Sequence, residues 1–575
     1  MKKKLSAFLA LLVCVSLFVT ACGNKDTAKN NTEKTKEKNV AEISQSEVIK
    51  ASDPSKLPEA AKARKDTLVV GFTPPEGKLS PIYSSSADES TVTGLIFGDG
   101  LVDTDEKGLP IPGLAEKWEV SEDNKTYTFY MKKGVKFSNG EEITADDIAF
   151  TYTAIADPAY DGPRMDAVKD FLGYEEYNQG DAATVEGIKV IDEYTISFTL
   201  KNIKAPAIYD FGYAPLCKSY YNFEKGQFAK HKEQLLSPMG AGPYTLKEYL
   251  AGQSVSLEAN KDYWKGSPKI KNIIFKGTTA ETQVQELVTG GVDIQRIGAK
   301  PENINKLKGE GFIELQLYPE NGYGYIGLNT KRPQLSDKRV RQALVYAINR
   351  QGFVDLYFKG NAIVMNTALS PVSWAYSDKV NPYPYDSEKA KELLDEAGWA
   401  VGKDGYRYKD GEKLKLSWLT YTGSKYVETL IPIVQNNLKE VGVEVVPELM
   451  EFGTLSTKVY EEQDFDMYNM AWTLSIDPDP MGIFGKEQCA LGGFNSVSWA
   501  PDKSVELMKA GLVETDQEKR TKIYQEWAEL INDEAPYIFL DAGKEMMAIS
   551  SRVKGVNCAT YVSWQKNVHL LELVQ

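Results

Sequence analysis

Short stretches of alternating apolar and polar residues predict β-strands in the first part of the chain. Residues 126–131 (TYTFYM) and 195–200 (TISFTL) alternate with the period of two that a half-buried strand requires. In residues 336–348, apolar side chains instead recur every three or four positions behind a Ser-Asp pair, which predicts a capped amphipathic helix. Residues 386–398 repeat this pattern and end at a glycine. Because strands and helices mix throughout, the predicted fold class is α/β.

The first 21 residues have the pattern of a secretory signal peptide. Three lysines precede an apolar stretch over residues 5–20, which is shorter than the roughly 20 residues of a membrane-spanning helix. The tetrad Val19-Thr20-Ala21-Cys22 resembles the bacterial lipobox, in which a peptidase cuts before a cysteine that carries lipid. We therefore expect lipidation at Cys22 and anchoring at the extracytoplasmic face of the bacterial cell membrane. The alternative is an ordinary secreted protein with a chance cysteine.

Residues 22–65 predict a tether between this anchor and a folded body. The segment is rich in Lys, Glu, Asn, Thr, Ser and Ala and contains no Phe, Trp or Tyr. Such a composition buries too little apolar surface to offset the entropy of ordering, so we expect the whole segment to be disordered.

Charge and cysteine content narrow the class of protein. Removal of the signal peptide, with its three lysines and no acids, takes the formal charge of the chain from −14 to −17. An acidic exported body is a poor partner for nucleic acid, which is held by Lys and Arg. Cys217, Cys489 and Cys558 remain and allow at most one disulfide. The body of roughly 510 residues must therefore be stabilised by hydrophobic cores rather than by disulfides. A body of this length should divide into two or three domains.

Several spaced motifs run through this body in a fixed order. The longest spans residues 115–147, from AEKW through FYMKKGVKFSNG to TADD. Further motifs follow at residues 240–244 (GAGPY), 260–264 (NKDYW), 327–330 (GLNT), 339–343 (RVRQA), 385–398 and 534–537 (EAPY). Together they resemble the family 5 extracellular solute-binding proteins, the dipeptide and oligopeptide receptors of ABC importers.

The resemblance implies a two-lobed, periplasmic-binding-protein-like fold of type II, with three domains and a hinge between the lobes. It assigns residues 66–105, 237–320 and 536–575 to domain I, residues 106–236 to domain II, and residues 321–535 to domain III, which is the second lobe. It further implies a monomer without a cofactor. Such a monomer captures oligopeptides by lobe closure and delivers them to the permease of an ABC transporter.

The segment NMAWTLSIDPDPMGIF, residues 469–484, places two acids directly before prolines. Proline pushes the preceding residue toward an extended conformation, so Asp477 and Asp479 are held outward as acceptors for a ligand amine or N–H group. The simpler interpretation is a turn. In the resembled family this loop carries an aspartate that pairs with the peptide α-amine, but at that distance from Trp472 this chain has Ser475. Either Asp477 binds the amine, or the amino end is not anchored there.

Other candidate ligand contacts are aromatic. Alternation along residues 323–329 puts Tyr323, Tyr325 and Asn329 on one strand face, where they could flank an extended ligand. The alternative is one more half-exposed strand. Trp374 and Tyr376 in a proline-broken loop are similar candidates, whereas Trp472 and Phe494 could also be core residues. The arginine that fixes the carboxylate in dipeptide receptors has no match in residues 420–425, which favours longer peptides held by their backbone.

Neither a catalytic nor a metal site is predicted. The chain has only two histidines, His231 and His569, and no HExxH, GxSxG, P-loop or CxxC pattern. Two further hypotheses remain open. The cleft could bind an oligosaccharide or chelated nickel instead of a peptide, or Asp477 and Asp479 could serve an exported hydrolase.

Overall fold

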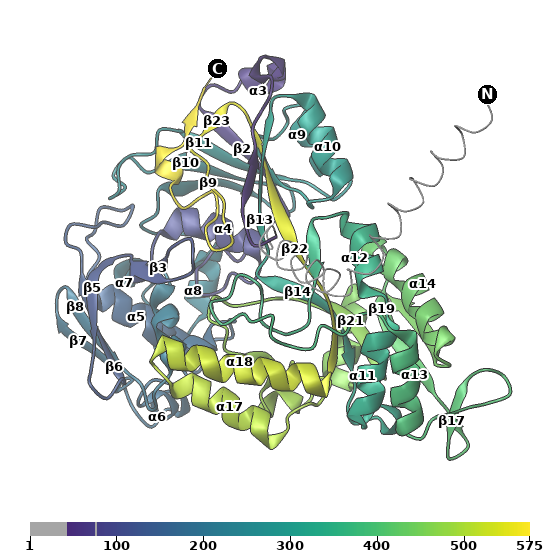
Figure 1. The fold of residues 1–575 in the computed structure, drawn as a ribbon. Helices are drawn as coiled ribbons and strands as arrows, with labels where there is room; N and C mark the ends of the chain where they lie inside the picture. The colour runs from purple at the N-terminus through teal and green to yellow at the C-terminus, as the bar shows by residue number, and fades with distance from the viewer. Residues whose placement is uncertain (1–42, 75–76, 575) are drawn as a thin grey trace, which may run out of the picture.

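The structure, a computed structural model, describes residues 43–74 and 77–574 (Figure 1). The expected signal peptide and Cys22 lie outside these residues. Of the helices in the described ranges, none combines the length and apolar character needed to cross a bilayer.

Two lobes share a mixed sheet of thirteen strands, and its main path runs β20-β19-β21-β14-β22-β12-β2-β11-β10-β9. The strands of lobe 1 are β1 (Glu47–Ile49), β2 (Thr67–Phe72), β9 (Tyr244–Leu250), β10 (Ser254–Ala259), β11 (Asn272–Gly277), β12 (Ile294–Arg296) and β13 (Ile313–Pro319). Those of lobe 2 are β14 (Gly322–Leu328), β15 (Ala362–Val364), β19 (Lys415–Tyr421), β20 (Glu444–Met450) and β21 (Met467–Thr473). The long strand β22 (Tyr537–Ser550) belongs to both lobes and crosses the molecule diagonally in Figure 1.

Lobe 1 also contains a separate antiparallel sheet, β5-β6-β8-β7, at the lower left of Figure 1. Its strands are β5 (Ala115–Val120), β6 (Thr126–Met131), β7 (Ile188–Asp192) and β8 (Thr195–Thr199). The principal helices of this lobe are α4 (Ala87–Phe97), α5 (Ala145–Ala156), α6 (Tyr174–Gln179), α9 (Gln283–Val288) and α10 (Pro301–Glu310), with the short 3-10 helix η3 (Ala205–Gly212). One hydrophobic core continues from β2 and α4 into this smaller sheet.

The helices of lobe 2 cover its sheet. They are α11 (Lys338–Ala347), α12 (Arg350–Phe358), α13 (Ser387–Glu396), α14 (Lys425–Glu440), α15 (Phe452–Thr457), α16 (Met481–Phe484), α17 (Asp502–Val513) and α18 (Gln517–Glu534). Strand β14 is buried along its whole length, because Ile326 and Leu328 pack into one core while Tyr323 and Tyr325 pack into another.

The elements predicted from local patterns are confirmed. The alternating segments form β6 and β8, and the two periodic segments form α11 and α13. Each of these helices begins after an aspartate whose side chain accepts a backbone N–H of the first turn, Asp337 for α11 and Asp386 for α13. The two-lobed α/β fold is also confirmed.

The chain crosses between the lobes at residues 320–321 and again within β22. The first half of β22 pairs with β14 in lobe 2, and its second half pairs with β13 in lobe 1. Strand β22 is therefore shared between the lobes, and the boundary expected at residue 535 lies just before it begins. The lobes also meet away from these crossings, where α17 packs against η3 and a Cβ atom at Gly108 would lie 2.6 Å from Cγ2 of Ile476.

The expectation of a disordered tether up to residue 65 is wrong for residues 43–65. Strand β1 pairs antiparallel with β13, and Leu57 and Ala61 are buried in the core of lobe 1. Ile43 is buried among lobe 2 side chains. The segment lacks aromatic residues, but the open edge of β13 satisfies its backbone hydrogen bonds, and a few aliphatic side chains are enough to fix it.

Deletion of residues 1–65 should therefore destabilise lobe 1. Loss of the β1 pairing and of the buried Leu57 side chain should lower the free energy of unfolding by about 2–4 kcal/mol. Guanidinium unfolding of this truncation, compared with one that begins at Ile43, measures the effect. Equal denaturation midpoints would show that residues 43–65 contribute nothing to stability.

Candidate ligand-binding site

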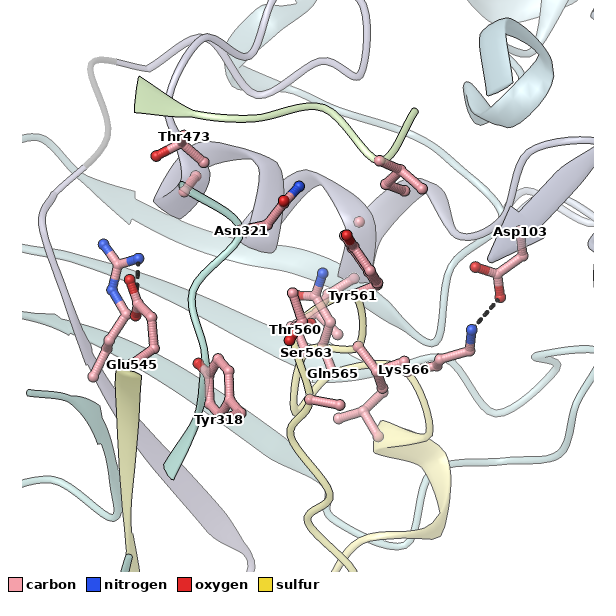
Figure 2. A pocket seen from close by; sticks show the side chains of 18 of the residues that line it. Asp103, Tyr318, Asn321, Thr473, Glu545, Thr560, Tyr561, Ser563, Gln565 and Lys566 are labelled. Carbon is pink, nitrogen blue, oxygen red and sulfur yellow. Dashed lines mark ion pairs between the residues drawn. The ribbon is translucent and has the colours of Figure 1, made fainter. Parts of the chain in front are cut away.

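A cavity of about 720 Å³ lies between the lobes (Figure 2). Lobe 1 lines it with Asp99, Asp103, Arg296, Tyr318, Glu320, Glu545, Thr560, Tyr561, Ser563, Gln565 and Lys566, and lobe 2 lines it with Asn321, Thr473, Leu474 and Ile476. The hydroxyl, amide and backbone groups of these residues offer both hydrogen-bond donors and acceptors.

Most of the charged side chains that line this cavity belong to ion pairs. The Nζ atom of Lys566 lies 3.2 Å from Oδ2 of Asp103, and Nη1 of Arg296 lies 3.6 Å from Oε2 of Glu545, as the dashed lines in Figure 2 mark. Nζ of Lys265 lies 2.8 Å from Oδ2 of Asp99. The cavity therefore presents polar walls rather than a strong field of one sign.

A smaller cavity of about 240 Å³ opens beside the first and shares Asn321, Thr473 and Leu474 with it. Its walls are mainly apolar and aromatic. They are formed by Tyr323, Ala368, Leu369, Trp472, Pro478, Pro480, Ile483, Phe484 and Phe494, with Ser370, Ser373, Ser475, Asp477 and Asp479 as polar members. The ring of Trp472 stacks over Tyr325, with centroids 6.2 Å apart, and its other neighbour Phe494 meets it edge-on at 5.5 Å. The aromatic walls are thus fixed by packing before any ligand arrives.

Asp477 forms a buried ion pair with Arg520 of α18. Nη1 of Arg520 donates to Oδ2 of Asp477 at 2.5 Å, and Nη2 donates to Oδ1 at 2.7 Å. Oδ1 also accepts the backbone N–H of Asp479 at 3.0 Å. The carboxylate is therefore occupied by a structural pair, and the role of amine acceptor that the sequence suggested for Asp477 is not supported by its surroundings.

Asp479 lines the smaller cavity, and the pKa of its carboxyl group is raised. Burial raises its pKa to about 6, although the N–H of Met481, which donates to Oδ1 at 3.2 Å, acts in the opposite direction. Asp477 raises the pKa further, while Arg520 and Lys204, a residue of lobe 1, lower it. A cationic group that entered the cavity would stabilise the ionised form of Asp479.

The structure divides the sequence-predicted residues into two groups. Tyr323, Trp472, Ser475, Asp477, Asp479 and Phe494 line the smaller cavity. Tyr325, Asn329, Trp374 and Tyr376 line neither cavity.

Packing accounts for this second group. Tyr325 stacks on Tyr537 at 4.1 Å between ring centroids, and Nδ2 of Asn329 donates to the carbonyl of Phe465 at 3.0 Å. Trp374 lies over the guanidinium of Arg520, which is 5.5 Å from its ring centroid, and Tyr376 packs in the same small cluster. Of these four, Tyr325 stacks on the cavity-lining Trp472, and Trp374 covers the arginine that binds Asp477.

Sequence reasoning missed the part of the site that the C-terminal segment supplies. Thr560, Tyr561, Ser563, Gln565 and Lys566 all belong to residues 559–566, which contain no named helix or strand. A segment without periodicity gives no signal that it lines a cavity. Thr560 is held in place because its hydroxyl donates to the carbonyl of Pro319 at 2.8 Å.

Neither histidine lines the two cavities. His231 is fully buried among Tyr83, Tyr221 and Phe228, and this burial lowers its pKa to about 4. Desolvation also lowers the pKa of His569. Within residues 43–74 and 77–574, no group of three or more metal-ligating side chains occurs.

Comparison with known proteins agrees with this architecture. The family profile "Bacterial extracellular solute-binding proteins, family 5 Middle" matches residues 110–486. The oligopeptide-binding protein AppA of Bacillus subtilis (strain 168) is 29% identical over 567 residues, which cover 96% of each chain. The solved structure of AppA from Bacillus subtilis in complex with a nonapeptide has a TM-score of 0.73 at 28% identity and covers 89% of this chain and 99% of its own.

A second solved structure, NikZ from Campylobacter jejuni in complex with Ni(L-His), shares the fold, with a TM-score of 0.75 at 23% identity over 88% of this chain and 99% of its own. The fold by itself therefore does not select the solute. The matched profile, which covers more than half of the chain, shows that this protein belongs to the family 5 bacterial extracellular solute-binding proteins.

Proposed function

We propose that this protein is the extracytoplasmic substrate-binding protein of an ABC importer and that it captures oligopeptides. The observation that carries the proposal is a polar cavity between the lobes with an aromatic cavity of lobe 2 directly beside it. Such a pair suits a peptide, whose backbone needs hydrogen-bond partners while its side chains need apolar space. The similarity to AppA, whose solved complex holds a nonapeptide, supports the same choice.

Lobe closure would be the mechanism of capture. Residues of both lobes line the larger cavity, so a bound peptide makes more contacts in the closed form than in the open form. A ligand shifts a conformational equilibrium only by this difference in affinity. The permease would then recognise the closed protein and receive the peptide from it, without any chemical change to the peptide.

Asp479 is the residue we assign to the ligand amine. Its carboxyl lines the smaller cavity, and within the described part of the chain the hydrogen bond that it accepts comes from the backbone N–H of Met481. Tyr323, Trp472 and Phe494 would surround the neighbouring side chain of the peptide. Lipid on Cys22 would keep the protein at the membrane, with the residues between Cys22 and β1 as its connection.

Peptide binding is directly testable on the purified protein. We expect native mass spectra to show co-purified peptides, and we expect added peptides from a random library to raise the melting temperature. Nickel-histidine and cello-oligosaccharides, titrated in parallel, should leave the melting temperature unchanged. A shift with either of these solutes, and none with the peptide library, would assign the protein to another cargo.

A further inference from the structure

Glu320 stands at the point where the chain crosses from lobe 1 to lobe 2. Its backbone N–H donates to the carbonyl of Gly543 at 3.0 Å, which continues the antiparallel pairing of β13 with β22. Because side chains alternate along a strand, Asp541, Gly543 and Glu545 lie on one face of β22. Glu320 lies opposite Gly543 on the neighbouring strand. It is therefore diagonal to both Asp541 and Glu545 on the same face of the sheet.

The negative charges of two further acids, Glu545 and Asp541, therefore act on Glu320 at this crossing. Arg296 of β12 is the cation that acts on Glu320, and it is already 3.6 Å from Glu545. Asp541 accepts the hydroxyl of Tyr426 at 2.6 Å. This contact needs Gly324, because a Cβ atom there would lie 2.8 Å from Oδ1 of Asp541.

Glu320 lies between two cavities. Glu320 lines the interlobe cavity on one side and a second cavity, of about 670 Å³, on the other. The remaining charged groups that line these two cavities are Asp88, Asp99, Asp103, Lys300, Lys544 and Lys566. Burial, followed by Glu545 and Asp541, raises the pKa of Glu320 to about 7.

We propose that Glu320 is a proton-sensitive switch of lobe closure, whose neutral form favours the closed lobes and whose ionised form favours the open lobes. Opening admits water to the crossing, which stabilises the ionised carboxylate. The closed form therefore binds the proton more tightly than the open form does. Protonation of Glu320 favours closure below about pH 7, and this contribution is lost as the pH rises through that value. Burial also raises the pKa of Asp541 to about 7, but Asp541 is covered by Tyr426 within lobe 2, so opening changes its surroundings less.

Small-angle X-ray scattering of the protein stripped of ligand tests this switch. Between about pH 5.5 and about pH 8.5, we expect the ratio of closed to open molecules to fall by about tenfold, seen as a rise in the radius of gyration. Glu320→Gln should hold the radius near its low-pH value throughout. Because no ligand is present, the outcome does not depend on which solute the cleft binds.

A second variant keeps the test decisive if Glu320→Gln folds poorly. Glu545→Gln removes the neighbouring charge that raises the pKa of Glu320, so the transition should remain but move to lower pH. Glu258→Gln, an exposed position on β10 of the same lobe, is the matched control and should behave as the wild type. A radius that is independent of pH in the wild type, or the same transition in Glu320→Gln as in the wild type, would overturn the proposal.

Discussion

Replacement of Arg520 by methionine should lower the free energy of unfolding by about 3–5 kcal/mol, the effect typical of removing one partner from a buried ion pair. The side chains of Arg520 and Asp477 are 7% and 9% exposed, and two short hydrogen bonds join them. Nε of Arg520 also donates to the carbonyl of Gly511 at 2.7 Å. The variant leaves the Asp477 carboxylate buried beside the smaller cavity without its cation.

Two controls separate the charge effect from the loss of packing. The double variant Arg520→Met with Asp477→Asn removes both charges and should recover most of the lost stability, because a neutral amide costs less to bury than a carboxylate. Arg339→Met removes an arginine from an exposed pair with Asp337 and should change stability by less than about 1 kcal/mol. Guanidinium midpoints compare the variants. If Arg520→Met is as stable as Arg339→Met, the pair is not structural.

Local sequence patterns predicted the structure correctly wherever the stabilising contacts join residues close in the sequence. The Ser-Asp pair at residues 336–337 lies directly before the helix that it caps and correctly marked the start of α11. The ion pair of Asp477 with Arg520 joins residues 43 positions apart, and neither residue shows in the sequence which partner it will find. The two acids before prolines therefore looked equivalent, although one is held by an arginine and the other faces the cavity.

Alternation located a strand face but not what covers that face. It placed Tyr323 and Tyr325 together, and the structure agrees, but Tyr325 is fully buried against Tyr537 while Tyr323 reaches the smaller cavity. Whether an aromatic face meets a ligand or another aromatic layer depends on which strands pair with it. That pairing is set by β22, more than 200 residues further along the chain.

Conversion of Asp479 to asparagine should weaken binding of peptides with a free α-amine by roughly tenfold to a hundredfold. This range corresponds to one charge-assisted hydrogen bond, about 1.5–3 kcal/mol. N-acetylated versions of the same peptides should bind the wild type and Asp479→Asn equally weakly, because they carry no amine to lose. Asp464→Asn, at a side chain 80% exposed on the same lobe, should leave affinity unchanged. Isothermal titration gives these constants.

The pH dependence of this affinity identifies Asp479 more specifically than the loss of affinity does. Burial holds the pKa of Asp479 at about 6, so the ionised acceptor forms, and affinity rises, as pH increases through that value. Above about pH 8 the peptide amine loses its proton and affinity falls again. Closure governed by Glu320 has the opposite sign, so the profile is best measured in the Glu320→Gln background. In Asp479→Asn, we expect the rise in affinity near pH 6 to disappear and the fall above about pH 8 to remain. If the rise near pH 6 is unchanged in this variant, the peptide amine binds another group.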